Sequence, residues 1–178
     1  MSEVARIESE ELHQYIDSIA NSIANKHRDN KELVIVGIAN GGIPFSINLA
    51  RALEKSLGLT VALGSVDISF HRDDLGHKPI TSIDNPTVLP VNIEDATVIL
   101  ADDVIFSGRT ARAALNEIFD QGRPGIIELA VLCDRGNRGL PIQPNYIGFS
   151  KETTINQRVV VKMNINDPSN DSLVILNA

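Results

Sequence analysis

The chain contains one cysteine, no tryptophan and only 4% aromatic residues. Because Cys133 stands alone, an internal disulfide and any metal site built on a CxxC pair are excluded. Apolar residues nevertheless make up 43% of the 178 positions, which is enough for a sizeable core of mostly aliphatic side chains. We therefore expect a single α/β domain over residues 1–178.

Positive charge is also scarce, since 16 lysines and arginines stand against 23 aspartates and glutamates, giving a net charge of −7. This balance argues against a broad nucleic-acid surface, although a local basic patch is compatible with it. Small molecules fit better as partners. The polar stretch "MSEVARIESEE" is typical of neither a signal peptide nor a membrane span, so a cytoplasmic protein without membrane contact is expected.

Continuous apolar runs alternate with helical patterns along the chain. Helices are predicted from Ser9, which can cap the first one, from Pro44, and over 110–121, because apolar residues recur there every three to four positions. Strands are predicted at 33–38, 61–70, from Thr97, and at 126–134. The alternation predicts a doubly wound, mainly parallel sheet, with shorter strands at "YIGF" and "RVVVKMN" near the C-terminus.

Ligands of such sheets bind at the carboxyl ends of the strands, where the stretch "VILADDVIFSGRT" is expected to lie. Its polar half connects a strand to a helix, so free N–H groups and the helix dipole can hold a phosphate. Asp102 and Asp103, about one sugar length away, can accept hydrogen bonds from two ribose hydroxyls. The open alternative is that the acids only cap the next helix and Gly108 only makes a turn.

The same stretch resembles the phosphoribosyl diphosphate (PRPP) fingerprint of type I phosphoribosyltransferases, with Ser107 where many members have threonine. The similarity extends through "GIANGGIP", "DISFHRDDL", "DQGRP", "LAVLCDRGNRGLPI" and "NYIGF", which look like the PyrR family. Members of that family are bacterial proteins that combine uracil phosphoribosyltransferase activity with pyrimidine-responsive RNA attenuation. The likeness covers roughly residues 10–165, more than a chance motif match gives.

The resemblance implies that uracil N1 attacks C1 of PRPP, pyrophosphate leaves and UMP forms. Mg²⁺ would be carried mainly by the oxygens of PRPP, and no dedicated metal site in the protein is predicted. Asp102, Asp103 and Arg72 are implied as catalytic, the acids at the ribose and the arginine at the pyrophosphate. The implied substrate-binding residues are Asn40 and Gly41 in the pyrophosphate loop, Val104, Ile105, Phe106, Ser107, Gly108, Arg109 and Thr110 around the 5-phosphate, and Arg135 and the backbone near Val159 at the base. A homodimer or a higher homo-oligomer is implied as well.

Simpler interpretations of several of these residues stay open. Arg72 can be a solvated arginine that pairs with a neighbouring aspartate, and Asp134 can simply neighbour Arg135 across a turn. The segment "ANGG" can be only a flexible connection, because glycine is the default residue at sharp bends. His71 and His77 lie six positions apart in a polar stretch, a spacing that only weakly suggests a metal pair.

The pyrophosphate loop departs from the family pattern. Members usually carry a basic residue and a threonine there, as in "TRG", whereas this chain has Asn40-Gly41-Gly42 and no cation. Losing a charge-assisted hydrogen bond of ~1.5–3 kcal/mol predicts slow turnover, and Gly41→Arg is then expected to raise it. The departure also favours the alternative function, a nucleotide-sensing regulator of the PyrR type with weak or no catalysis.

RNA binding by such a regulator requires a face of cations. The first predicted helix offers Asp17, Ser18 and Asn21, none of which is basic. Lys26, Arg123 and Arg138 remain as a sparse set of cations. RNA is therefore a possible partner to which we expect only weak binding.

Overall fold

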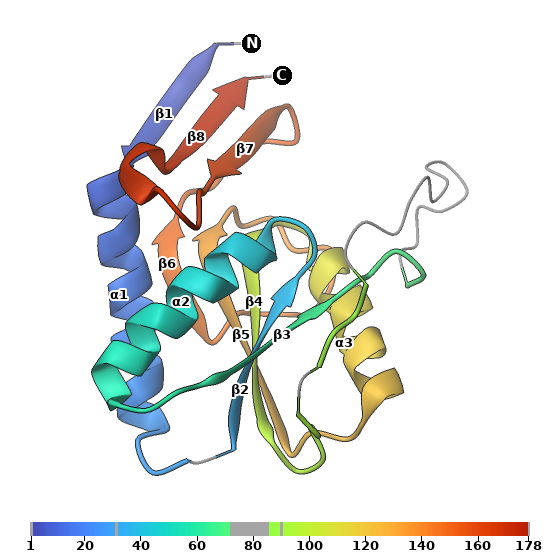
Figure 1. The fold of residues 1–178 in the computed structure, drawn as a ribbon. Coiled ribbons are helices and arrows are strands. Elements are labelled where there is room, and N and C mark those ends of the chain that lie inside the picture. Colours follow the sequence, from blue (N-terminus) through green and yellow to red (C-terminus); the bar gives the residue numbers. More distant parts are fainter. Residues whose placement is uncertain (1, 31, 72–85, 90, 178) are drawn as a thin grey trace.

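A central sheet of five parallel strands organises the computed structural model, which describes residues 2–30, 32–71, 86–89 and 91–177 (Figure 1). Its strands lie in the order β3-β2-β4-β5-β6. Their bounds are β2 Leu33–Ile38, β3 Ala62–Val66, β4 Thr97–Ile105, β5 Ile126–Asp134 and β6 Tyr146–Ser150. Each neighbouring pair is parallel, so the carboxyl ends of all five strands meet at one edge of the sheet.

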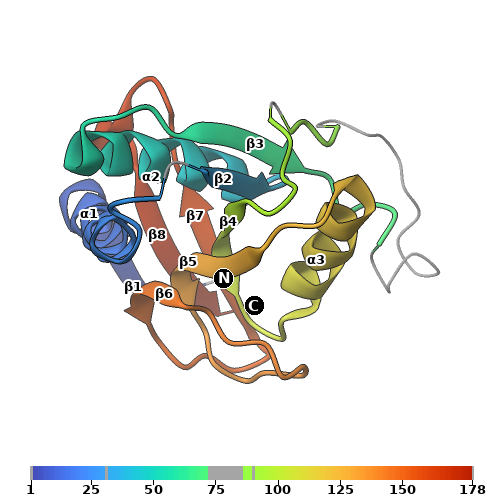
Figure 2. The same ribbon diagram turned by 90° about the horizontal axis from the view of Figure 1, so that it is seen from below.

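Helices cover both faces of this sheet (Figure 2). On one face lie α1 Ser9–Lys26 and α2 Gly42–Leu57, and on the other lies α3 Arg109–Gln121. Two hydrophobic clusters fill the spaces between the helices and the sheet. Because every residue of β2 is buried, its sequence is apolar throughout, as expected for a strand between two helical layers.

A second, smaller sheet lies beyond the carboxyl ends of the central strands (Figure 1). It is antiparallel and has the order β1-β8-β7, with β1 Glu3–Glu8, β7 Gln157–Lys162 and β8 Ser172–Asn177. A short 3₁₀ helix, η1 Pro168–Asn170, precedes β8. The two ends of the chain thus meet in one sheet above the edge at which ligands are expected.

The expected doubly wound, mainly parallel sheet with small C-terminal strands is confirmed, with three local corrections. Residues 3–8 form a strand that the sequence did not indicate, because their partner β8 lies at the other end of the chain. The strand predicted at 61–70 is only Ala62–Val66. Ser9 does not cap α1, because Glu8 holds the N-cap position and the Ser9 hydroxyl donates to the Pro168 carbonyl at 2.6 Å.

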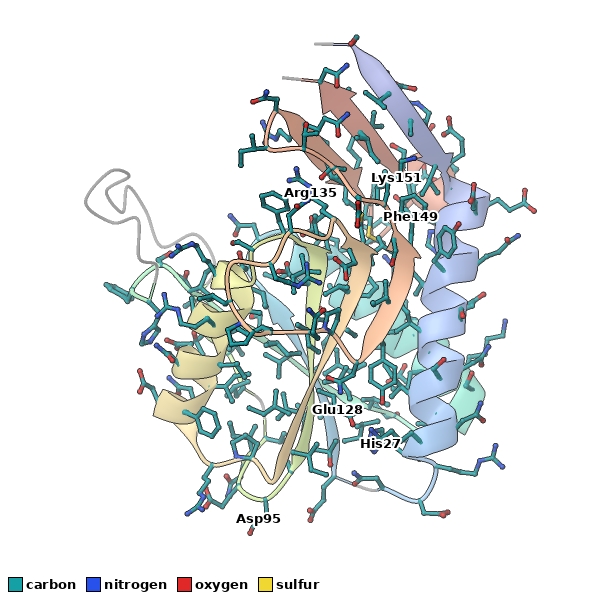
Figure 3. The ribbon with its side chains drawn as sticks, turned by 180° about the vertical axis from the view of Figure 1, so that it is seen from behind. His27, Asp95, Glu128, Arg135, Phe149 and Lys151 are labelled. Carbon is teal, nitrogen blue, oxygen red and sulfur yellow. The ribbon has the colours of Figure 1, made fainter. Side chains whose placement is uncertain are left out.

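A buried polar cluster connects the end of α1 to β5 and β6, at the end of the sheet opposite to the carboxyl ends of the strands (Figure 3). Glu128 Oε2 accepts a hydrogen bond from the Tyr146 hydroxyl at 2.5 Å and lies 2.8 Å from His27 Nε2, and Lys26 donates to Glu128 Oε1. Burial alone would raise the pKa of Glu128, but the hydrogen bonds from Lys26, Tyr146 and His27 outweigh it and lower that pKa to about 2.

Glu128→Gln is therefore expected to lower the free energy of unfolding at pH 7 by about 3 kcal/mol, because the folded state stabilises the ionised carboxylate. This stabilisation is fully present above the ordinary pKa of 4.5 and is lost as the pH falls toward about 2. Urea denaturation at several pH values measures it, with the exposed Glu152→Gln as control. Equal losses in the two variants would contradict the role of the cluster.

Among the helices of the described residues, none has the length and apolar character needed to cross a membrane.

Candidate functional site

Two neighbouring carboxyl groups lie at the carboxyl end of the central strand β4. Asp102 is only 5% exposed, and Asp103 is half-buried. The backbone N–H of Asp103 donates to Asp102 Oδ1 at 3.0 Å, which orients the first carboxyl group. The two acids thus occupy the edge of the sheet at which loops from β2, β4 and β5 can meet.

Both carboxyl groups hold their protons more tightly than ordinary aspartates. Burial raises the pKa of Asp102 well above its ordinary value, and the nearby charge of Asp103 raises it further. Burial also raises the pKa of Asp103. Two carboxylates in so small a volume repel each other, and hydroxyl donors or a cation brought by a ligand would relieve that repulsion.

The connection between β2 and α2, residues 39–41, and Gly42 at the start of α2 pack directly against these acids. A Cβ atom added at Gly41 would lie 2.3 Å from Asp103 Oδ2, and one added at Gly42 would lie 2.4 Å from the Ala101 carbonyl oxygen. Close approach to the backbone therefore requires glycine at position 42, whereas a side chain at position 41 would displace the Asp103 carboxyl group. Asn40 and Gly41 are exposed, and the peptide bond between Ala39 and Asn40 is cis.

The loop region from Val104 to Thr110 runs from the last two residues of β4 into the first two residues of α3. Gly108 is the N-cap of the helix and has φ 88°, a left-handed conformation that favours glycine. The Arg109 N–H lies 3.4 Å from the Ser107 hydroxyl oxygen, and both Arg109 and Thr110 are exposed. Backbone N–H groups at the open start of α3, together with the helix dipole, form an arrangement suited to an anion.

The segment after β5 supports this loop from behind. The Ser107 carbonyl accepts hydrogen bonds from the N–H groups of Gly139 and Leu140 at 3.0 and 3.1 Å. Arg138 donates to the Phe106 carbonyl at 2.8 Å and to Asp134 Oδ2 at 2.7 Å. Its side chain is only 11% exposed. Arg138 is therefore not available to RNA, contrary to the expectation from sequence.

Arg135 links the same loop to the small sheet (Figure 3). Its guanidinium lies 4.2 Å from the centre of the Phe106 ring, and it donates to the Thr153 hydroxyl at 2.7 Å and the Gln157 carbonyl at 2.6 Å. Burial lowers the pKa of Arg135. Asp134 pairs with Arg138 rather than with Arg135, which replaces the turn pairing considered from sequence.

The sequence-predicted residues fall into three groups. Gly41 contacts Asp103 directly, and residues 104–110 form the adjoining loop. Val159 lies in β7, half-buried and packed against the core, while the Arg135 guanidinium is already engaged by protein groups. Arg72 and His77 lie outside the described residues, whereas His71 is described. The support given by Arg138 was missed, although its i, i+4 spacing from Asp134 was visible in the sequence.

Comparisons with known proteins show the family to which the chain belongs. A family model described as a phosphoribosyl transferase domain matches residues 8–167. A relative from Roseiflexus sp. (strain RS-1), named Bifunctional protein PyrR, is 36% identical over 176 residues, which cover 99% of this chain and 96% of the relative. A protein of the same name from Nostoc punctiforme is 44% identical over 156 residues, covering 86% and 85% of the two chains. One from Corynebacterium glutamicum is 42% identical over 162 residues, covering 88% and 84%.

Solved structures support the fold. A hypoxanthine phosphoribosyl transferase from Trypanosoma cruzi matches with a TM-score of 0.70 at 20% identity, covering 98% of this chain and 92% of that one. A hypoxanthine-guanine-xanthine phosphoribosyltransferase matches with a TM-score of 0.58 at 20% identity, covering 82% and 76%. At this level of identity the likeness shows the fold alone.

Proposed function

This chain belongs to the phosphoribosyltransferase family and, within it, to the PyrR proteins, and from that premise we propose that it converts uracil and PRPP to UMP and pyrophosphate. One observation carries the proposal. The paired acids at the end of β4 lie between a glycine loop on one side and the open start of a helix on the other. A ribose that bears an anion at each end fits this arrangement.

The 5-phosphate is assigned to the loop 104–110. The start of α3 supplies N–H donors, and the Ser107 and Thr110 hydroxyls add two more. The supporting hydrogen bonds from Gly139, Leu140 and Arg138 hold the loop carbonyls away from the anion. Because the loop is already held in place, it loses little conformational entropy when the phosphate binds.

The ribose hydroxyls are assigned to Asp102 and Asp103. Each ionised carboxylate accepts charge-assisted hydrogen bonds, which fix the sugar while its C1 atom becomes oxocarbenium-like in the transition state. As uracil N1 bonds to C1, the bond from C1 to the pyrophosphate oxygen breaks, the bonding electrons leave with pyrophosphate, and the N1 proton passes to water. Negative charge nearby favours the cationic sugar.

The departing pyrophosphate is assigned to Asn40 and Gly41, whose exposed loop contacts the ribose acids. Arg72 is proposed as a further cation for it. The one group of three metal-ligating side chains among the described residues lies elsewhere. Asp102 and Asp103 would help to hold a Mg²⁺ ion carried by PRPP, because carboxylate oxygens are ligands that this ion prefers. That ion would supply positive charge to the leaving group when bound.

The choice of uracil rests on the PyrR resemblance, because the described contacts select no base. Equal concentrations of uracil, orotate, hypoxanthine and guanine, incubated together with PRPP, Mg²⁺ and the protein, test it when the nucleotides are separated by chromatography. UMP is expected as the main product. Predominant IMP or GMP would replace uracil by a purine while leaving the transferase assignment intact.

A nucleotide-responsive regulator is the second candidate. The relatives are named bifunctional, and the exposed loop residues Asn40 and Gly41 carry no cation for pyrophosphate. Calorimetry with UMP separates the candidates, since tight UMP binding without turnover selects the regulator. Turnover with uracil selects the enzyme.

RNA binding is expected to be weak even with UMP present. Of the three cations named from sequence, Arg138 is mostly buried against Asp134, which leaves Arg123 and the partly exposed Lys26, itself paired with Glu128, on the surface. Few phosphate contacts give low affinity at physiological salt. Filter binding with pyrimidine-leader RNA at about 0.15 M salt measures the affinity. A UMP-dependent dissociation constant of ~10⁻⁹ M would contradict the expected weak binding.

A further inference from the structure

A cluster of metal-ligating side chains lies on the outer part of α3, away from the acids of the transferase site. His71 Nε2 lies 3.1 Å from Glu117 Oε2 and 3.1 Å from Asp120 Oδ2. His71 belongs to the turn after β3, and the two acids are three positions apart on α3, so they share one face of the helix. Glu117 follows Thr110 by seven residues, which is about 10 Å along the helix axis.

We propose that His71, Glu117 and Asp120 bind a divalent transition-metal cation of the Zn²⁺ class. The three ligand atoms all lie within 4.8 Å of one another. In a tetrahedral zinc site with bonds of about 2.0–2.1 Å, neighbouring ligand atoms are ~3.3 Å apart. The two distances of 3.1 Å therefore match two edges of such a tetrahedron.

Surrounding hydrogen bonds hold two of the ligands in place. The Thr87 hydroxyl donates to Glu117 Oε1 at 2.6 Å, which turns the free oxygen Oε2 toward His71. Arg112 donates to the His71 carbonyl at 2.7 Å, and the His71 N–H donates to the Ile68 carbonyl at 3.0 Å. In metal sites, hydrogen bonds from neighbouring groups typically orient the ligands, as the Thr87 hydroxyl does here for the Glu117 carboxylate.

Charge and exposure also suit a cation. A neutral imidazole with two carboxylates carries two negative charges, which a divalent ion neutralises. Glu117 and His71 are mostly buried, whereas the Asp120 side chain is 64% exposed, so a cation can enter from solvent and keep a water molecule as its fourth ligand.

The site does not depend on transferase activity. A bound cation would fasten the turn after β3 to α3 and so reinforce the hydrogen bond from Arg112 to the His71 carbonyl. Its expected signatures are therefore binding stoichiometry and thermal stability rather than turnover.

Titration of the metal-free full chain with Zn²⁺ against a chromogenic chelator tests the proposal. One tightly bound equivalent and a raised melting temperature are expected. Asp120→Asn should weaken Zn²⁺ binding at least about tenfold, because it removes an anionic ligand. Because the Asp120 side chain is exposed, this variant should fold normally. Glu117→Gln removes the second anionic ligand and tests the same site.

His13→Ala is the matched control, since His13 pairs with Asp171 at 2.9 Å in a different part of the molecule and should leave Zn²⁺ binding unchanged. Co²⁺ in place of Zn²⁺ should show the intense visible absorption of a tetrahedral site, and Asp120→Asn should change it. If the unmodified protein binds no stoichiometric Zn²⁺, or if the Asp120 variant binds it equally well, the three residues form an ion-pair cluster and the proposal is overturned.

Discussion

Replacing both Asp102 and Asp103 by asparagine is expected to lower kcat/KM for PRPP by at least about tenfold, because each carboxylate supplies charge-assisted acceptors to the ribose and negative charge to the cationic sugar. Steady-state kinetics with uracil and PRPP measures the loss. Asp17→Asn, an exposed change on α1, is the matched control. Unchanged kinetics in a folded double variant would remove the ribose assignment.

The same double variant should also respond less to pH. Because the pKa of Asp102 in the folded protein is raised above its ordinary value of 3.8, the folded state binds this proton more tightly than the unfolded chain. The free energy of unfolding contributed by this group therefore falls as the pH rises from about 3.8 through the raised pKa. Asparagine carries no such proton, so melting temperatures of the variant should decline less over that range.

Gly41→Ala is expected to cost at least about tenfold in kcat/KM for PRPP while the fold is kept. The added Cβ would lie 2.3 Å from Asp103 Oδ2, so the carboxyl group, the free end of a side chain, must move out of position. Gly42→Ala should behave differently. There the added atom would lie 2.4 Å from the Ala101 carbonyl oxygen. This oxygen belongs to the backbone of β4 and cannot move without distorting the strand, so a lower melting temperature is expected.

Gly139→Ala is the control for these two changes, because its added Cβ would find no atom closer than 3.6 Å. The backbone at Gly41 has φ −65°, so conformation itself does not exclude a side chain. The gain in turnover expected from Gly41→Arg on sequence grounds is nevertheless reversed, because the same contact with Asp103 applies to any side chain. An active Gly41→Ala enzyme would show that Asp103 has room to adapt.

The parts of the fold that local patterns specify could be predicted from sequence. Local signals include the apolar runs of β2, β4 and β5 and the glycine at the N-cap of α3. The positions of the site loops follow from where those strands end. Strand β1 could not be predicted in this way. It is short, only half of its residues are apolar, and its pairing with β8 joins residues at opposite ends of the chain.

Side-chain partners were the least predictable feature. Arg135, Arg138 and Asp134 lie within one glycine-rich turn, where several pairings are equally compatible with the spacing. Packing decides among them, because Arg138 reaches the carbonyl of Phe106 and Arg135 stacks on the ring of that same residue. The cluster of His71, Glu117 and Asp120 joins a turn and a helix that the sequence alone does not bring together.

Pyrophosphate release from PRPP, followed with and without uracil in the presence of Mg²⁺, is the sharpest test of phosphoribosyl transfer by these loops. We expect release to require uracil, to match UMP formation one for one, and to fall at least about tenfold with Asp102→Asn and Asp103→Asn combined. Tight UMP binding without uracil-dependent release, or release that the double variant leaves unchanged, would contradict it.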